Sequence, residues 1–287
     1  MPDTHEVLVR GDEIELTVLP GAGARLHSLR VRGRELLRTP DDPAQHMSDP
    51  FFWGAYVMAP WCNRITPGPI AVGGRTVDLE PNFTDGSAIH GQVYAAAWQQ
   101  VGDASFEIEH EGDGWPWPYR AMQEVSVEGL RVSIVQRLTN LSDDPMPGGI
   151  GIHPWFPTPV EVRINSALTY GNAKASTVHA VPVAGDLDLR ERAPLAQGVD
   201  ATWADPGNPA FELWWPNGLH AAVRALFPTL HVVAAYAPER AAIAVEPETN
   251  APQGLRRLLN GEPGALALLE PGREICLPIT IDFDGGA

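Results

Sequence analysis

Apolar and polar residues alternate with a period of two along most of this chain of 287 residues. Such alternation is typical of half-buried β-strands, because successive side chains of a strand point to opposite faces of its sheet. The segments that favour strands are residues 13–19, 25–31, 106–112, 123–129, 130–138, 160–164, 230–237, 241–245 and 274–283. Turn signals separate them, and the chain holds 28 glycines and 28 prolines. The pattern predicts an all-β fold.

Helical periodicity is almost absent, and GLRRLL (254–259) is the one clear helical candidate. Many short strands without crossover helices favour a large antiparallel sandwich or barrel. The sequence shows no internal repeat and no linker-like break, so we expect a single domain over residues 1–287. Segments 40–60 and 165–210 alternate weakly, and we expect them to be loops over one face of the sheets.

The net charge of −16 argues against a nucleic-acid or anionic-membrane partner, which would require a basic surface. The two cysteines, Cys62 and Cys276, are far apart and fit neither a disulfide framework nor a zinc ribbon. The single lysine, Lys174, lies in YGNAKAST, which matches neither a P-loop nor a Schiff-base site. We find no signal peptide and no apolar run of membrane-spanning length, and therefore expect a soluble, cytoplasmic protein that binds a small molecule.

Five short clusters hold side chains suited to chemistry. They are WCNRI with Asn63 and Arg64, SAIHG with His90, HPWF with His153 and Trp155, AVEPETNAP with Glu246 and Glu248, and GVDATW with Asp200. A lone histidine after a strand more often has a structural role than a catalytic one. Glu246 follows the apolar run AAIAV, where burying a carboxylate is costly unless the group is paired or used. Alternation places Glu246 and Glu248 on the same face, so either glutamate fits a catalytic role.

The order and surroundings of these clusters resemble the aldose 1-epimerase (galactose mutarotase) family. The resemblance runs from about residue 14 to about residue 283. It includes LPGAGARLHSLRVRGRELL, the NRI and IHG segments, GWPWPYRAMQEVSV, the HP-aromatic-F segment and AVEPETNAP. The resemblance implies a large antiparallel β-sandwich, often called a supersandwich, with few short helices.

The resemblance also implies roles for individual residues. Glu246 would be the general base at the anomeric hydroxyl, His153 the general acid at the ring oxygen, and His90 an assisting, ring-binding group. The side chains expected to bind the sugar are Arg64, Asn63, Asp200 and Trp155. A base and an acid on opposite sides of the anomeric centre can open and close the ring without metal or cofactor. The expected partner is a sugar, and the protein is expected to be a monomer or a homodimer.

Three alternatives remain at this stage. His90, His153 and Glu246 could form a facial triad that binds iron or manganese, which metal analysis would reveal. The same pocket could bind a carbohydrate without turnover, in which case binding would survive Glu246→Gln. Glu246 and Asp200 could also serve as the two carboxylates of a glycosidase.

Overall fold

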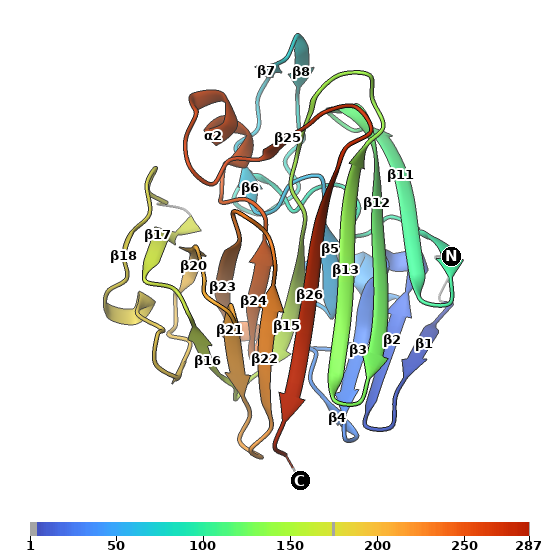
Figure 1. Cartoon of the computed structure of the whole chain (residues 1–287), viewed down its shortest axis with the longest axis vertical. Helices are drawn as coiled ribbons and strands as arrows, with labels where there is room; N and C mark the ends of the chain where they lie inside the picture. The colour runs from blue at the N-terminus through green and yellow to red at the C-terminus, as the bar shows by residue number, and fades with distance from the viewer. Residues whose placement is uncertain (1–4, 174–175, 287) are drawn as a thin grey trace.

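The computed structural model describes residues 5–173 and 176–286, and Lys174 lies outside them. Two large antiparallel sheets dominate the described chain and pack face to face (Figure 1). The single-domain expectation stays a prediction, while the all-β antiparallel sandwich is confirmed.

The first sheet has eleven strands among the described residues. In spatial order they are β1 (Val7–Arg10), β2 (Ile14–Leu19), β3 (Arg25–Val31), β5 (Ala55–Met58), β15 (Gly151–Pro157), β24 (Ala242–Glu248), β23 (His231–Ala237), β20 (Asp200–Ala204), β17 (Leu168–Asn172) and β18 (Val181–Pro182), with β4 (Arg34–Glu35) paired to β3. Strands β15 and β24 therefore lie side by side near its middle.

The second sheet has nine strands within the described part of the chain. Their order is β10 (Gln99–Gly102), β11 (Ser105–Gly112), β12 (Trp115–Glu128), β13 (Arg131–Asn140), β26 (Glu274–Asp284), β22 (His220–Ala225), β21 (Phe211–Trp214), β16 (Glu161–Ile164) and β19 (Ala193–Pro194). It covers one face of the first sheet.

Smaller elements connect and cap the two sheets. They are the pairs β6 (Arg64–Ile65) with β9 (Ala88–Ile89), β7 (Ile70–Val72) with β8 (Arg75–Val77), and β14 (Met146–Gly148) with β25 (Ala267–Leu269), the helices α1 (Gln45–Ser48) and α2 (Gly254–Asn260), and the 3-10 turns η1 (Pro20–Ala22), η3 (Gly185–Leu187) and η4 (Pro238–Arg240). No described helix has the length and apolar character needed to cross a membrane.

The alternation of β15 and β24 decides which side chains enter the core. Ile152, Phe156 and Pro247 face the second sheet, where they meet apolar side chains such as Ile134 and Ile279. The residues between them in sequence must point the other way. His153, Trp155, Glu246 and Glu248 therefore lie on the outer face of the first sheet. A second apolar cluster covers part of that face and includes Tyr56, Met58, Cys62, Trp155, Phe51 and Phe52.

The strands expected from alternation are confirmed, and the helical candidate becomes α2. The expectation of loops over 40–60 and 165–210 was wrong in part, because β5, β17, β18, β19 and β20 fall there. All four residues of β5 and four of the five in β20 are buried. Strands covered on both faces carry no polar alternation, so the period-two pattern does not reveal them.

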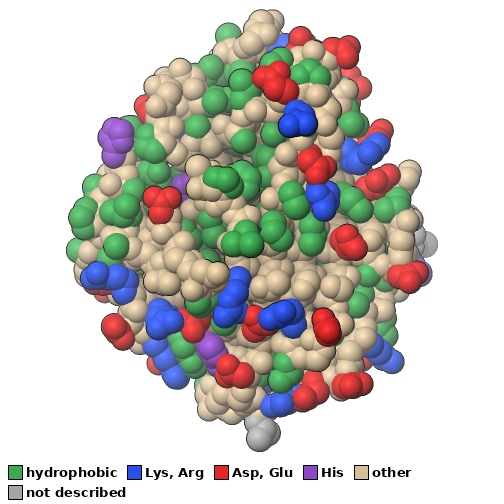
Figure 2. Space-filling model, viewed as in Figure 1, with side chains coloured by type: hydrophobic (Ala, Val, Ile, Leu, Met, Phe, Trp, Pro, Cys, Tyr) green, Lys and Arg blue, Asp and Glu red, His purple; other side chains and the backbone are tan. Residues whose placement is uncertain are grey.

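Acidic and basic side chains intermingle over the face of the molecule shown in Figure 2. Many of them pair across neighbouring strands of the second sheet, as Arg137 does with Glu274 at 2.7 Å. This face therefore presents mixed charge rather than a basic patch suited to a polyanion.

Candidate active site

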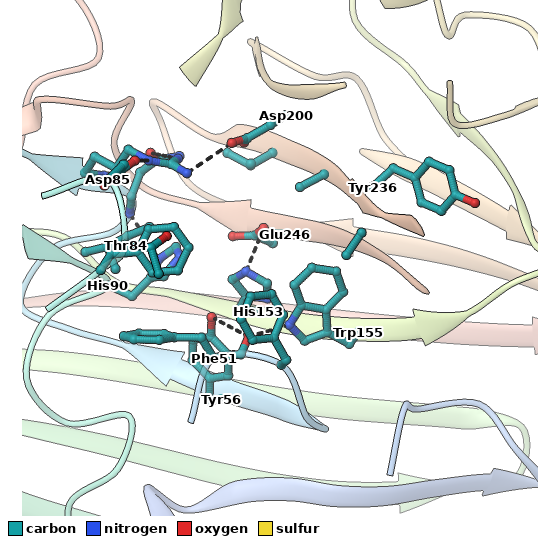
Figure 3. A pocket seen from close by; sticks show the side chains of 18 of the residues that line it. Phe51, Tyr56, Thr84, Asp85, His90, His153, Trp155, Asp200, Tyr236 and Glu246 are labelled. Atoms are coloured by element: carbon teal, nitrogen blue, oxygen red, sulfur yellow. Dashed lines mark hydrogen bonds and ion pairs between the residues drawn. The ribbon is translucent and has the colours of Figure 1, made fainter. Parts of the chain in front are cut away.

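A pocket of about 250 Å³ opens on the outer face of the first sheet (Figure 3). Its floor comes from β15, β23 and β24, and its walls come from the segments around residues 51–56, 63–64 and 83–90. The seven residues expected at the site all line it: Asn63, Arg64, His90, His153, Trp155, Asp200 and Glu246. The fold thus gathers into one pocket side chains from five separate parts of the sequence.

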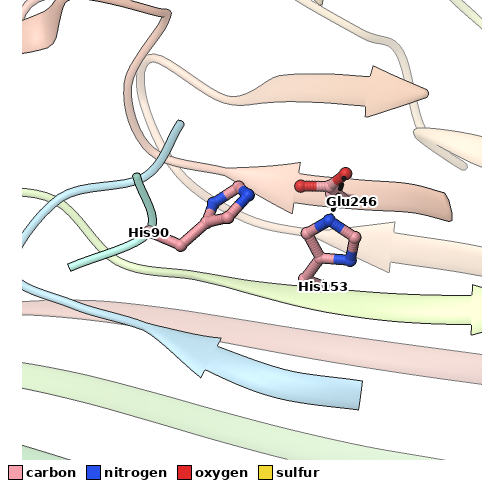
Figure 4. Close-up of side chains that lie close together, drawn as sticks. All are labelled: His90, His153 and Glu246. Carbon is pink, nitrogen blue, oxygen red and sulfur yellow. Dashed lines mark ion pairs between the residues drawn. The ribbon is translucent and has the colours of Figure 1, made fainter. Parts of the chain in front are cut away.

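His153 and Glu246 meet on the pocket floor (Figure 4). The register that pairs Gly151 with Glu248 and Trp155 with Ala244 places His153 opposite Glu246. His153 Nε2 lies 3.1 Å from Glu246 Oε1, and both side chains are at least nine-tenths buried. The two candidate residues are therefore side by side on the pocket floor. Adjacency suits the reaction, because the anomeric hydroxyl and the ring oxygen are bonded to the same carbon.

Burial sets the protonation states of Glu246 and His153. It raises the pKa of Glu246 well above the usual range, and the nearby Glu248 carboxyl adds to the rise. Burial also lowers the pKa of His153, to about 3. Both shifts favour the neutral forms of the two groups, as expected where charge is removed from water.

The backbone around His90 fixes the tautomer of its ring. The backbone N–H of Asn63 donates to His90 Nδ1 at 3.3 Å, and the backbone N–H of His90 donates to the Asn63 carbonyl at 3.2 Å. Since Nδ1 is an acceptor, the proton of the neutral ring is on Nε2. Figure 4 shows this second nitrogen facing Glu246. Burial lowers the pKa of His90 well below its usual value, so the ring stays neutral and its Nε2–H is available as a donor in the pocket.

Arg64 forms the polar wall with two carboxylates. Its Nε donates to Asp85 at 2.9 Å, and a terminal nitrogen donates to Asp200 at 3.0 Å. Asn63 Oδ1 accepts from the Arg64 backbone N–H at 2.9 Å. A guanidinium between carboxylates offers donors and acceptors next to one another, which suits vicinal hydroxyl groups.

Aromatic side chains line the opposite wall. Tyr56 stacks on His153 with 4.6 Å between ring centroids. Trp155 Nε1 donates to the Phe51 carbonyl at 2.6 Å, and its ring lies 5.5 Å from that of Phe52. The floor strand therefore holds the segment that carries Phe51 and Phe52 against the pocket.

Some lining residues escaped the sequence interpretation. Asp85 stood out only as part of a TDGS turn, 21 residues after Arg64. Phe51 and Phe52 form an FFW run in a segment read as loop, and nothing in the alternation connects that run to β15. The polar turn directly before the IHG segment was the one available signal.

The cluster of His90, His153 and Glu246 does not fit a metal site. One candidate ligand atom from each residue lies within 4.8 Å of the other two. However, histidines that bind metals donate their second ring N–H to an acceptor. His90 Nδ1 instead faces the N–H of Asn63, and His153 Nδ1 has no hydrogen-bond partner in the described chain. The donor set suits proton transfer better than ligation.

Solved structures of low sequence identity share this architecture. A putative aldose 1-epimerase from Escherichia coli K12 superposes with a TM-score of 0.82 and 20% identity, covering 98% of this chain and 99% of that one. A galactose 1-epimerase from Lactobacillus acidophilus NCFM gives 0.78 and 16%, covering 98% and 95%. A galactose mutarotase-like protein from Clostridium acetobutylicum gives 0.83 and 15%, covering 97% and 94%. The fold is therefore that of the galactose mutarotase-like β-sandwiches.

Sequence comparison agrees with the fold. The family described as Aldose 1-epimerase matches residues 8–281. The uncharacterized protein YphB of Escherichia coli (strain K12) is 27% identical over 114 residues, which span 39% of this chain and 39% of that protein. The chain belongs to the aldose 1-epimerase family.

Proposed function

We propose that this protein is a mutarotase that interconverts the α and β anomers of a neutral aldose. The observation that carries the proposal is the direct contact between Glu246 and His153 on the floor of a pocket with hydroxyl-binding groups. His90 adds a neutral hydrogen-bond donor at the same place. Family membership and the shared fold support the same reaction.

The reaction moves two protons and breaks one bond. The Glu246 carboxylate takes the proton from the anomeric hydroxyl, and the bond between C1 and the ring oxygen breaks with its electron pair on oxygen. The imidazolium of His153 gives its Nε2 proton to that oxygen, which leaves the open-chain aldehyde. Rotation about the C1–C2 bond presents the other face of the aldehyde. Ring closure returns each proton by the reverse steps.

The buried setting favours the open-chain stage. When the ring is open, Glu246 carries a proton and His153 has lost one, so both groups are neutral. Burial raises the pKa of Glu246 and lowers the pKa of His153, which stabilises this neutral pair relative to the ionised pair that begins the reaction. The same shifts make the neutral pair the resting state, so the reaction begins when the Glu246 proton passes to His153 Nε2 across their 3.1 Å contact, and this transfer is part of the barrier.

The charge of the pocket favours a neutral sugar over a sugar phosphate. Arg64 is already paired with Asp85 and Asp200, and Glu239 also lines the pocket. Arg256 donates to a backbone carbonyl outside the pocket rather than lining it. A phosphate would therefore meet a net negative surface without an unpaired arginine among the described lining residues.

Anomer exchange followed by proton NMR tests the function. Freshly dissolved α-galactose, glucose, arabinose, xylose and glucose 6-phosphate would each be followed near neutral pH, with and without protein. We expect acceleration of at least one neutral sugar and none of glucose 6-phosphate. Binding of a sugar without acceleration would instead indicate a carbohydrate-binding protein.

A further inference from the structure

Asp85 is a pocket carboxylate that takes no part in the proton transfers above. It lies on the turn over residues 83–87 and lines the pocket beside Arg64 (Figure 3). Its two oxygens have separate partners. Oδ2 accepts from Arg64 Nε at 2.9 Å, while Oδ1 accepts from the backbone N–H of Ser87 at 3.1 Å and from the Ser87 hydroxyl at 2.6 Å. One carboxylate therefore shapes the turn and holds the arginine at the same time.

The ion pair between Arg64 and Asp85 is largely removed from water. The exposed fractions of the two side chains are 12% and 17%, so solvent screens this pair less than a pair on the open surface. Burial acts to raise the pKa of Asp85, but the hydrogen bonds from Ser87 and Arg64 outweigh it and hold the pKa below its usual value. Asp85 therefore stays ionised near neutral pH and offsets the charge of the guanidinium.

Arg64 is the only lysine or arginine among the described residues that line the pocket. The turn that carries Asp85 also places the Phe83 ring 5.6 Å from the Arg64 guanidinium carbon. A guanidinium has five N–H donors, and the contacts of Arg64 with Asp85, Asp200 and Asn63 use three of them. The remaining donors are free for the hydroxyl groups of a ligand. An anionic ligand, by contrast, would meet an arginine whose charge is already balanced.

We propose that Asp85 is a specificity-determining residue, which fixes Arg64 and offsets its charge so that the pocket binds a neutral aldose and rejects the carboxylate of a uronic acid. The inference rests on the proposed function for the ligand being a sugar. A carboxylate binds a guanidinium best through two parallel N–H bonds. Asp85 already occupies Nε, one of the two donors that a side-on pair requires, and its own charge repels a second carboxylate.

Asp85→Asn separates the charge of this residue from its shape. The amide has nearly the same size, but it has one oxygen where the carboxylate uses two, so it cannot keep both the Ser87 and the Arg64 contacts as they are. Dissociation constants near neutral pH would be measured for galactose with galacturonate and for glucose with glucuronate. Each pair differs only at C6, where the uronic acid carries an ionised carboxylate. We expect Asp85→Asn to bind the hexose more weakly and the uronic acid more tightly, which lowers their ratio of dissociation constants by about tenfold or more.

Two control variants isolate the effect. Ser87→Ala loosens the same turn but keeps the Asp85 charge, and Glu128→Gln removes a carboxylate at the exposed end of β12, outside the pocket. We expect both to leave the ratio of dissociation constants as in wild type. An equal loss of affinity for hexose and uronic acid in Asp85→Asn, or an unchanged ratio, would mean that Asp85 only supports the turn, and would overturn the proposal.

The Nε–H proton of Arg64 reports the contact without any ligand. Its ¹⁵N–¹H NMR signal would be assigned by its loss in Arg64→Lys. We expect this proton to exchange slowly with water in wild type and in Ser87→Ala, and about tenfold faster or more in Asp85→Asn. Equal exchange in wild type and Asp85→Asn would overturn the fixing of Arg64. If wild type accelerates no sugar, the mutarotase function fails, while the binding ratio and this exchange rate still decide the role of Asp85.

Discussion

Burial sets the protonation states of Glu246 and His153. Neither has an unusual bonding partner, and their 3.1 Å contact is an ordinary one. Removing both groups from water favours the neutral pair over the ionised pair, which reverses their order in solution. The sequence interpretation named both residues but gave no indication of how far apart they lie. Only the register between β15 and β24 shows that they are neighbours.

Ionisation of Glu248 should lower the free energy of unfolding as the pH rises. The folded pKa of about 8 is higher than that of an exposed glutamate. The neutral carboxyl therefore contributes fully to folding stability at acidic pH, and this contribution is lost as the pH approaches 8. We expect Glu248→Leu to unfold at the same or higher denaturant concentration than wild type. Its advantage should grow by about 1 kcal/mol per pH unit between about pH 5 and pH 8. Urea unfolding across this range measures it, and an advantage independent of pH would contradict the raised pKa.

The segment after β9 aims the His90 ring into the pocket. His90 and Asn63 both have positive φ, of 60° and 58°, and each bonds to the other. Gly91 follows with φ of 74° and lies against the Ala59 carbonyl. The IHG segment predicts a turn that carries a histidine. The sequence does not predict that this turn packs against Ala59, because the two segments are distant along the chain.

Gly91→Ala should therefore displace His90. A β-carbon at residue 91 would stand 1.9 Å from the Ala59 oxygen, so the backbone must move. Gly33→Ala is a matched control, because Gly33 has φ of 77° and nothing within 4 Å of the added carbon. Gly33→Ala should cost about 1–2 kcal/mol from backbone strain alone. Gly91→Ala should cost more than this and lower the mutarotation rate, as unfolding and anomer-exchange assays would show. Equal effects of the two changes would contradict the close contact.

The sheets were largely predictable, and their covered strands were not. Strands such as β13 alternate because one face is buried and the other faces solvent, and the sequence shows this contrast as alternating apolar and polar residues. Strand β5 has no such contrast, since the second sheet covers one face and the Phe51 segment the other. The pocket depends on these covered strands. Its residue types could be predicted, but its shape and the role of Asp85 could not.

Buried histidines should make the whole molecule sensitive to acid. Burial lowers the pKa of His46 to about 2, of His153 to about 3 and of His231 to about 4. A lowered folded pKa gives stability that is complete above the unfolded value of about 6.5 and is lost as the pH falls below it. We expect the unfolding free energy of wild type, relative to His46→Gln, to fall by about 1 kcal/mol per pH unit below about pH 6. A constant difference in urea unfolding would show that His46 titrates normally.

The most direct test of the function is the anomer-exchange rate of Glu246→Gln beside wild type. Glu128→Gln, an exposed change at the end of β12, controls for the loss of one carboxylate. With the neutral sugar that wild type turns over best, we expect Glu246→Gln to be slower by about 10³-fold and Glu128→Gln to match wild type. A Glu246→Gln protein that keeps the wild-type rate would contradict the assignment of the base and the mechanism built on it.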